Sequence, residues 1–315
     1  MNKKLIIIAL GGNALLKNGQ KGTIAEQRNN VRETMKALFP LIDAGHHLVI
    51  THGNGPQVGF VLLKNDAGEQ LYDIPQVPLD VAVADTQGEI GYLIQSELYG
   101  LLRQNNVKRE ILSTNTMVEI SAADTAFQNP TKRIGKTYYD PQEVERLTAE
   151  KNWHFKQETK NGKTGWRRVV PSPKPVDIIG KNTIKNLANS GTIVIAVGGG
   201  GVPVSVTRDT LQGQEAVIDK DLASALLAQQ IQADRFVILT DVPYVYLHYG
   251  TDQQQAVETI NVAQAKEWMQ QGVFGEGNMA PKIQAALHFI ESGGKEVWIT
   301  DLNGIKESKG TKIIP

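Results

Sequence analysis

The stretch IAVGGGGVPV, residues 195–204, places four consecutive glycines directly behind a run of small apolar and β-branched residues. Glycine weakens a regular element because it loses the most backbone freedom on folding. The stretch therefore predicts a buried strand that ends abruptly in a turn. Because a turn without Cβ atoms lets backbone N–H groups approach an anion closely, we interpret the glycines as a bare surface for a phosphate. A plain tight turn is the alternative.

The same unit of apolar strand and turn recurs along the chain. Short apolar runs without alternation occupy residues 4–10, 46–52, 192–197, 235–240 and 296–300. Such runs are typical of parallel strands that are covered on both faces. Since amphipathic stretches lie between them, the sequence predicts a three-layer αβα sandwich around a mainly parallel sheet.

Helix-boundary signals support this alternation. Thr23 and Glu26 form a capping box that opens a long helix, and Gly45 is suited to end it. Residues 219–234 predict a further helix that begins at Asp219. These helices lie between predicted strands, as an αβα sandwich requires.

Residues 124–174 break the pattern, because apolar runs vanish there and polar residues take their place. Within them, residues 154–169 predict a hairpin that turns at Asn161 and Gly162. We therefore expect one α/β domain over residues 1–315, in which residues 124–174 form a small inserted, protruding subdomain or lid.

The charge and cysteine counts exclude several classes of function. The 33 Lys and Arg residues balance 33 Asp and Glu residues, so neither nucleic acid nor an anionic membrane is an expected partner. The absence of cysteine excludes disulfides, thiolate catalysis and cysteine zinc sites. The apolar run near the N-terminus is too short for a signal peptide, and no segment approaches a membrane span. We expect a cytoplasmic protein.

Three glycine-rich turns follow apolar strands, and these turns are candidates for binding a phosphate. Their residues are Gly11, Gly12 and Asn13, then Gly53, Asn54 and Gly55, then Gly199, Gly200 and Gly201. In open α/β sheets, ligands bind beyond the carboxyl ends of the strands. The Walker pattern fails because Gln157 and Pro130 stand at its first glycine position, and the dinucleotide fingerprint lacks its third glycine. The turns indicate a phosphate site of another kind.

Three lysines stand where a phosphate site would use them. Lys220 lies between two acids at a predicted helix start, and Lys282 lies at another. At Lys282 the cation opposes the helix dipole, which suggests a nearby anion. Lys132 lies in the polar insert. Glycine-loop donors, lysines, Mg²⁺ and acids to organise them are the parts that phosphoryl transfer needs. The alternative is that these lysines are solvated surface charges.

Nine motifs resemble, in order along nearly the whole chain, those of the carbamate kinases of the amino-acid kinase superfamily. They are ALGGNAL, HGNGPQVG, PLDVAVADTQGEIGY, FQNPTKRIG, GWRRVVPSPKPVDI, VGGGGVPV, EAVIDKDLA, ILTDVPYVY and GNMAPKIQAA. Many other members of the superfamily carry a lysine before the first glycine pair, whereas Ala9 stands there, as in carbamate kinases. The resemblance implies an eight-stranded, mainly parallel sheet between helices and assembly as a homodimer.

The resemblance further implies reversible phosphoryl transfer between ATP and carbamate, giving ADP and carbamoyl phosphate, with Mg²⁺. In fermenting bacteria this reaction usually runs toward ATP, as the last step of arginine breakdown. By the same likeness Lys220 and Lys282 would bracket the transferred phosphoryl group, and Asp221 would hold Lys220 in place. Lys132 would reach in from the lid.

The other site residues implied by the resemblance divide between the two substrates. The phosphoryl group and carbamate would contact Gly11, Gly12, Asn13, Gly53, Asn54 and Gly55, with Gly199, Gly200 and Gly201 in the floor of the site. The nucleotide would contact Thr240, Asp241, Tyr244 and Met279. The Mg²⁺ ion would be held mainly by the nucleotide phosphates, with Asp219 in its outer shell.

Four positions depart from the family pattern: Arg133, Gly180, His248 and Asn278. They leave the acceptor preference open. One alternative function is another amino-acid kinase that makes an acyl phosphate from a larger carboxylate, but the sequence holds no motif for an amino-acid tail. The other is a non-catalytic nucleotide-binding regulator, which predicts the loss of Lys220 or Lys282.

Overall fold

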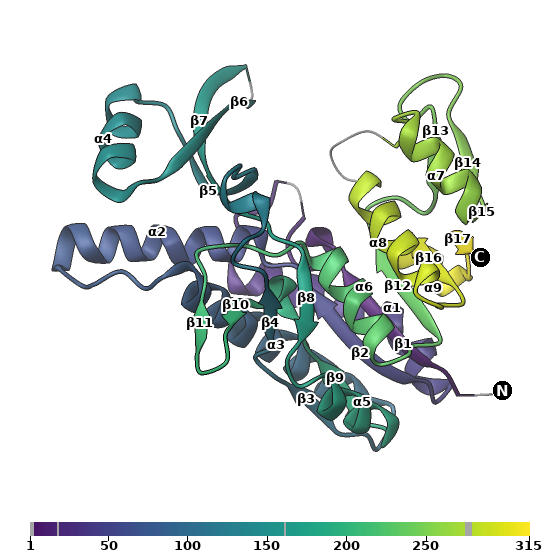
Figure 1. Cartoon of the computed structure of the whole chain (residues 1–315). Coiled ribbons are helices and arrows are strands. Elements are labelled where there is room, and N and C mark those ends of the chain that lie inside the picture. The colour runs from purple at the N-terminus through teal and green to yellow at the C-terminus, as the bar shows by residue number, and fades with distance from the viewer. Residues whose placement is uncertain (1–2, 18, 161, 275–278) are drawn as a thin grey trace.

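The computed structural model describes residues 3–17, 19–160, 162–274 and 279–315 (Figure 1). The departure at Asn278 lies outside these residues. No helix within them combines the length and apolarity of a bilayer-spanning segment.

Eight strands of the described chain form the main sheet, in the order β15-β17-β16-β12-β1-β2-β9-β3. Their bounds are β1 Leu5–Leu10, β2 His47–His52, β3 Ile111–Ser113, β9 Ile193–Ile195, β12 Arg235–Leu239, β15 Thr259–Asn261, β16 Val297–Thr300 and β17 Thr311–Ile314. The pair β16–β17 is antiparallel and the other neighbours are parallel. The five predicted apolar strands are all present, side by side, and the mainly parallel αβα sandwich is confirmed.

Each face of the sheet is covered by its own helices. On one face the side chains of Ile6, Ile8 and Leu10 pack with α1 (Ile24–Asp43), α3 (Leu79–Gln104) and α9 (Leu302–Glu307). On the other face Leu5, Ile7 and Ala9 pack with α5 (Lys181–Asn189), α6 (Lys220–Gln230), α7 (Val262–Gln270) and α8 (Ala280–Glu291). Since burial of one isoleucine contributes about 1.5–3 kcal/mol, the run in β1 anchors both layers.

The predicted starts of both helices are confirmed, whereas α6 ends at Gln230 and not at Asp234. The Glu26 N–H donates to Thr23 Oγ1 at 3.2 Å, and the Thr23 N–H donates to the Glu26 carboxylate at 2.8 Å. Gly45 follows the helix with a φ of +77°, a conformation that only glycine adopts without strain. Asp219 caps α6 by accepting from the N–H of Asp221 at 2.9 Å. These ends place the α6 N-terminus at the carboxyl edge of the sheet.

A smaller unit projects from the sandwich (Figure 1). It holds the three-stranded sheet β5-β7-β6, made of β5 (Lys132–Tyr138), β7 (Lys163–Val170) and β6 (His154–Lys160), with α4 (Pro141–Lys151) beside it. The predicted hairpin is the antiparallel pair β6–β7, although Asn161 in its turn lies outside the described residues. We call this unit, residues 132–170, the subdomain. The helix α2 (Gly55–Tyr72) runs alongside it.

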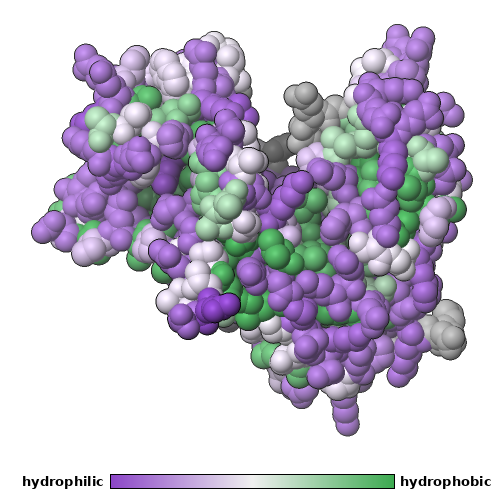
Figure 2. Space-filling model, in the orientation of Figure 1, coloured by the Kyte–Doolittle hydropathy of each residue, from purple (hydrophilic) through white to green (hydrophobic). Residues whose placement is uncertain are grey.

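Two further small sheets complete the fold. The first has the order β11-β10-β4-β8, and the second is the pair β13–β14. Their bounds are β4 Met117–Ile120, β8 Pro175–Ile178, β10 Val202–Val206, β11 Leu211–Gly213, β13 Val245–Leu247 and β14 Gln255–Val257. Figure 2 shows the surface hollowed between the subdomain and the region of β13, β14 and α7. The carboxyl ends of the central strands lie at the base of this hollow.

Candidate active site

The glycine-containing turns meet at one edge of the sheet, because β1, β2 and β9 are parallel neighbours. Two cavities open there. The larger, of about 890 Å³, is lined by Gly11, Gly12 and Asn13 after β1 and by Thr240 and Asp241 after β12. The smaller, of about 310 Å³, is lined by residues that include Gly53, Asn54, Gly55, Gly199, Lys132 and Asp219. The predicted gathering of these turns at one sheet edge is confirmed.

Lys220 and Lys282 line both cavities, together with Gly12, so they stand in the wall between the two. The buried carboxylate of Asp221 lies between these lysines, 2.5 Å from Lys220 Nζ and 3.6 Å from Lys282 Nζ. One carboxylate against two ammonium groups leaves local positive charge. Such a wall can stabilise an anion that passes from one cavity to the other.

A second ion pair links the subdomain to this wall. Lys132 Nζ lies 3.0 Å from Asp219 Oδ2, while Asp219 Oδ1 accepts the backbone N–H groups of Asp221 and Leu222. Burial by itself would raise the pKa of the Asp219 carboxyl, but the Lys132 ammonium, the nearby Lys220 and the Asp221 N–H together outweigh burial and hold that pKa below its ordinary value. Asp219 is therefore a charged anchor for Lys132.

Burial changes the titration of Lys282. Removal from water lowers the pKa of its ammonium group, the nearby Lys220 lowers it further, and the Asp221 carboxylate partly opposes both. A lysine whose pKa is lowered in this way is a compact cation held out of water, where its field acts strongly on a neighbouring anion.

The tetraglycine turn has a different physical reason from the expected bare surface. All four glycines are buried, and only Gly199 among them lines either cavity. Gly199, Gly200 and Gly201 have φ values of +65°, +91° and +90°. A Cβ on Gly199 would lie 2.3 Å from Asn54 Nδ2, and one on Gly200 would lie 2.4 Å from the Ile218 carbonyl oxygen. The turn is free of side chains mainly so that neighbouring segments can pack against it.

This packing predicts a large difference between two glycine substitutions. Gly200 and Gly180 have similar positive φ values, +91° and +87°, but a Cβ on Gly180 would meet nothing within 4 Å. Gly180→Ala pays the backbone strain alone, about 1–3 kcal/mol. Gly200→Ala adds overlap with a carbonyl, so we expect it to lower the free energy of unfolding by about 2 kcal/mol more. Urea unfolding of both variants measures this, and equal losses would contradict it.

A chain of hydrogen bonds holds the loop of Gly53, Asn54 and Gly55 in place. The Asn54 amide donates to Thr86 Oγ1 at 2.9 Å, and Thr86 Oγ1 donates to the Val83 carbonyl at 2.7 Å. His52 is buried, and its Nδ1–H donates to the Gly53 carbonyl at 3.0 Å. Thr86 lies in the motif PLDVAVADTQGEIGY, but its contact with Asn54 could not be predicted, because the two residues are 32 positions apart.

His52 predicts a loss of stability in acid. Burial lowers its pKa from 6.5 to about 4. Between these two pH values His52 is therefore protonated in the unfolded chain and neutral in the folded chain. The free energy of unfolding therefore falls by about 3 kcal/mol from this group as the pH drops from 6.5 to 4. His52→Gln should flatten this slope in urea titrations, whereas His154→Gln, at an exposed position, should not. Parallel slopes for wild type and His52→Gln would contradict the assignment.

The other predicted residues are placed in several ways. Thr240 Oγ1 donates to Asp241 at 3.0 Å in the larger cavity. Tyr244 packs edge-on against Tyr246, and Met279, the N-cap residue of α8, packs against the apolar core. Neither is among the described residues that line the two cavities. Gly200 and Gly201 likewise lie behind the cavity wall.

The larger cavity also has lining residues that the sequence patterns above did not predict. Its further lining residues include Lys17, Glu33, Asp301, Asn303 and Lys306. The signal was available for Asp301 and Asn303, since DLNG directly follows the apolar run EVWIT. Polar residues behind a parallel strand lie at the edge where ligands bind.

Of the positions that depart from the family pattern, two have a visible role. Gly180 is the N-cap of α5 in a left-handed conformation that favours glycine. Arg133 lines the smaller cavity and lies 3.8 Å from Glu158 within the subdomain. Nothing in the structure explains His248, which has a φ of +51°.

Comparisons with known proteins agree with this arrangement. Residues 4–301 match the model of the amino acid kinase family. The carbamate kinase of Pyrococcus furiosus is 45% identical, with 99% of each chain covered, and that of Trichomonas vaginalis is 43% identical over 98% of this chain and 99% of its own. The structure of Giardia lamblia carbamate kinase bound to AMP-PNP superposes with a TM-score of 0.92, at 36% identity over 99% of this chain and 98% of that one. The chain belongs to the amino acid kinase family and, within it, to the carbamate kinases.

Proposed function

We propose that this protein transfers a phosphoryl group reversibly between ATP and carbamate, giving ADP and carbamoyl phosphate. One observation carries the proposal: Lys220 and Lys282 flank the buried Asp221 in the wall shared by two cavities. The larger cavity has room for a nucleotide and the smaller one suits a small anion. The carbamate kinase relatives support the same assignment.

The chemistry follows from the charges. Carbamate is an anion that attacks a phosphate, so like-charge repulsion is a main part of the barrier. Lys220 and Lys282 would meet the negative charge that spreads over the equatorial oxygens during transfer. The substrate itself attacks, so the protein needs no nucleophile of its own.

Other residues of the wall hold the lysines and the substrate. Asp221 keeps both ammonium groups oriented, and Gly11 and Gly12 allow the backbone to approach the phosphate closely. Lys132 would add a third cation from the subdomain side, where Gly53 and Asn54 border the acceptor. The site thus surrounds the transferred group without a side-chain nucleophile or base.

Mg²⁺ fits this site as an ion carried by the nucleotide. No group of three or more His, Cys, Asp or Glu side chains gathers as a metal cage among the described residues. Both oxygens of Asp219 already accept hydrogen bonds, which suits an outer-shell role. The ion would be held mainly by phosphate oxygens, as is common for Mg²⁺, and would neutralise charge on them.

Three finer assignments belong to the same proposal. The direction toward ATP would serve fermentative arginine breakdown, the protein would act in the cytoplasm, and two copies would form a homodimer. They rest on the resemblance to the carbamate kinases.

The function is tested by coupled formation of ATP from ADP and carbamoyl phosphate with Mg²⁺ present. Acetyl phosphate at the same concentration is the matched control, because it offers a phosphoryl group on a different acyl carrier. Activity with carbamoyl phosphate and little with acetyl phosphate supports the proposal. The reverse preference would indicate a kinase for another carboxylate, and binding of ADP without turnover would indicate a regulator.

A further inference from the structure

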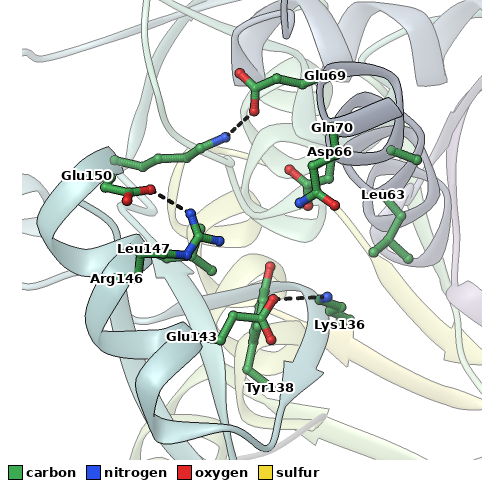
Figure 3. A pocket seen from close by; sticks show the side chains of 12 residues that line it. Leu63, Asp66, Glu69, Gln70, Lys136, Tyr138, Glu143, Arg146, Leu147 and Glu150 are labelled. Carbon is green, nitrogen blue, oxygen red and sulfur yellow. Dashed lines mark hydrogen bonds and ion pairs between the residues drawn. The ribbon is translucent and has the colours of Figure 1, made fainter. Parts of the chain in front are cut away.

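A pocket of about 450 Å³ lies between α2 and the subdomain, apart from the two cavities of the candidate site. Leu63, Asp66, Ala67, Glu69 and Gln70 line it from α2. The subdomain contributes Lys136, Tyr138, Glu143, Arg146, Leu147, Glu150 and Lys151. In Figure 3 the labelled side chains of the two groups face each other across this space.

Each cation in the pocket pairs with a carboxylate. Lys136 pairs with Glu143 at 3.5 Å, Arg146 with Glu150 at 2.6 Å, and Lys151 with Glu69 at 2.6 Å. Every cation that lines the pocket among the described residues thus has an acid partner. Asp66 is the one charged residue of the described lining outside these pairs, and its carboxylate accepts a hydrogen bond from the Gln76 amide at 2.9 Å. Because no lining cation is left to attract an anion, the pocket is better explained by its ion pairs than by an anionic ligand.

The pair Lys151–Glu69 differs from the other two because it alone of the three crosses from the subdomain to α2. Arg146–Glu150 lies within α4, and Lys136–Glu143 joins β5 to α4. The Glu69 carboxylate is also held on its own side, since the Gln76 amide donates to it at 2.8 Å. Lys151 therefore meets a carboxylate whose position is already fixed.

The two elements that meet in this pocket also reach the candidate active site. Strand β5 carries Lys132 into the smaller cavity and Lys136 into the pocket. The two lysines are four positions apart along the strand. Helix α2 begins at Gly55 in the smaller cavity and carries Glu69 into the pocket. Strand β5 and helix α2 thus connect the pocket to the smaller cavity.

Between these two points the subdomain is attached by apolar packing. Ile134 and Val170 of the subdomain are buried in a cluster with Val58 and Val83. Gly135 beside them has a φ of +67°, and the β5–β7 register shifts between Arg133 and Thr137. This cluster lies between Lys132 on one side and the Lys151–Glu69 ion pair on the other.

We propose that Lys151 and Glu69 are positioning residues for Lys132. Their pair holds the subdomain against α2, and through β5 it keeps the Lys132 ammonium beside Asp219 in the smaller cavity. The proposal rests on the proposed function, because Lys132 is taken to meet carbamoyl phosphate. The pair is partly exposed, with side-chain exposures of 25% for Lys151 and 43% for Glu69. Breaking it therefore changes the equilibrium between the docked and the displaced subdomain by only about 1.5- to 5-fold.

The test measures ATP formation with Glu69→Gln and Lys151→Met. We expect each variant to raise the KM for carbamoyl phosphate about 1.5- to 5-fold and to leave the KM for ADP unchanged. Glu150→Gln is the matched control, because it breaks a pair in the same pocket that stays within α4, and it should change neither KM. The exchanged pair Glu69→Lys with Lys151→Glu should restore the wild-type KM.

A second step separates positioning from a general loss of structure. If the pair acts through Lys132, adding Glu69→Gln to Lys132→Ala should raise the KM for carbamoyl phosphate no further. The proposal is overturned if the two effects multiply, or if Glu69→Gln and Lys151→Met behave like wild type.

A third measurement does not depend on activity. Because the chain has no cysteine, spin labels can be placed at Ala149→Cys on α4 and Asn189→Cys on α5, both exposed. Glu69→Gln should broaden the distance distribution between the labels, and an unchanged distribution would overturn the proposal. If the wild type lacks activity with carbamoyl phosphate, the proposed function fails, while this measurement still tests the contact.

Discussion

Replacing Lys220 by alanine is expected to lower kcat by about 10²- to 10³-fold, which is the usual cost of losing one preorganised donor to a transition state. Lys220 is the first residue of α6 and lines both cavities, while Asp221 would still be paired with Lys282 in the variant. The fold should therefore survive. Steady-state ATP formation and a thermal unfolding curve measure the two effects, and Lys282→Ala should lower kcat similarly.

Lys181→Ala is the matched control for this variant. Lys181 is also the first residue of a helix, α5, and its Nζ also lies 2.5 Å from an aspartate, Asp177. It does not line either cavity among the described residues, so its removal should leave kcat unchanged. Near-normal kcat for Lys220→Ala would remove the central element of the proposed mechanism.

Replacing Asp221 by asparagine is expected to lower the free energy of unfolding by about 3–5 kcal/mol, because it removes a buried carboxylate that balances the charge of two ammonium groups. The side chains of Asp221 and Lys282 are only 5% and 7% exposed. The asparagine keeps the shape of the side chain but removes the carboxylate between the two ammonium groups. Urea unfolding at pH 7 measures the loss.

The pH dependence of this loss follows from Lys282. Burial already lowers its pKa in the folded protein, so the unfolded chain holds its proton to higher pH and stability rises with pH over that interval. Loss of Asp221 lowers that pKa further, so the variant should recover part of its stability as the pH rises toward 10.5, the ordinary pKa of lysine. Asp177→Asn is the control, since its pair with Lys181 is about one-third exposed and should cost under about 1 kcal/mol. Equal losses for Asp177→Asn and Asp221→Asn would show that burial is not the cause.

Local signals in the sequence were sufficient to predict the layers of the fold. The apolar run of β1 predicts burial on both faces, and Thr23, Glu26 and Asp219 predict helix starts, because each effect acts within a few residues. The parallel arrangement then brings Gly12, Gly53 and Gly199 to one edge. This much of the candidate site could be predicted from strand and turn patterns.

Contacts between distant residues could not be predicted in this way. The pairing of Lys132 with Asp219 spans 87 residues, and that of Lys151 with Glu69 spans 82. The tetraglycine turn was misinterpreted for the same reason, because the atoms that would overlap with its side chains belong to Asn54 and Ile218. Only the folded chain shows which segments approach that closely.

The place of β1 in the sheet has a consequence for synthesis of the chain on the ribosome. β1 pairs with β2 on one side, but its other edge is covered by β12, and the contact from Leu5 to Asp234 spans 229 residues. At about 5–20 residues per second, this apolar edge waits on the order of 10–50 s for its partner strand to emerge. An unpaired edge of this kind readily joins other chains. The nascent protein therefore depends, during that interval, on low concentration or on chaperones that shield the first strand.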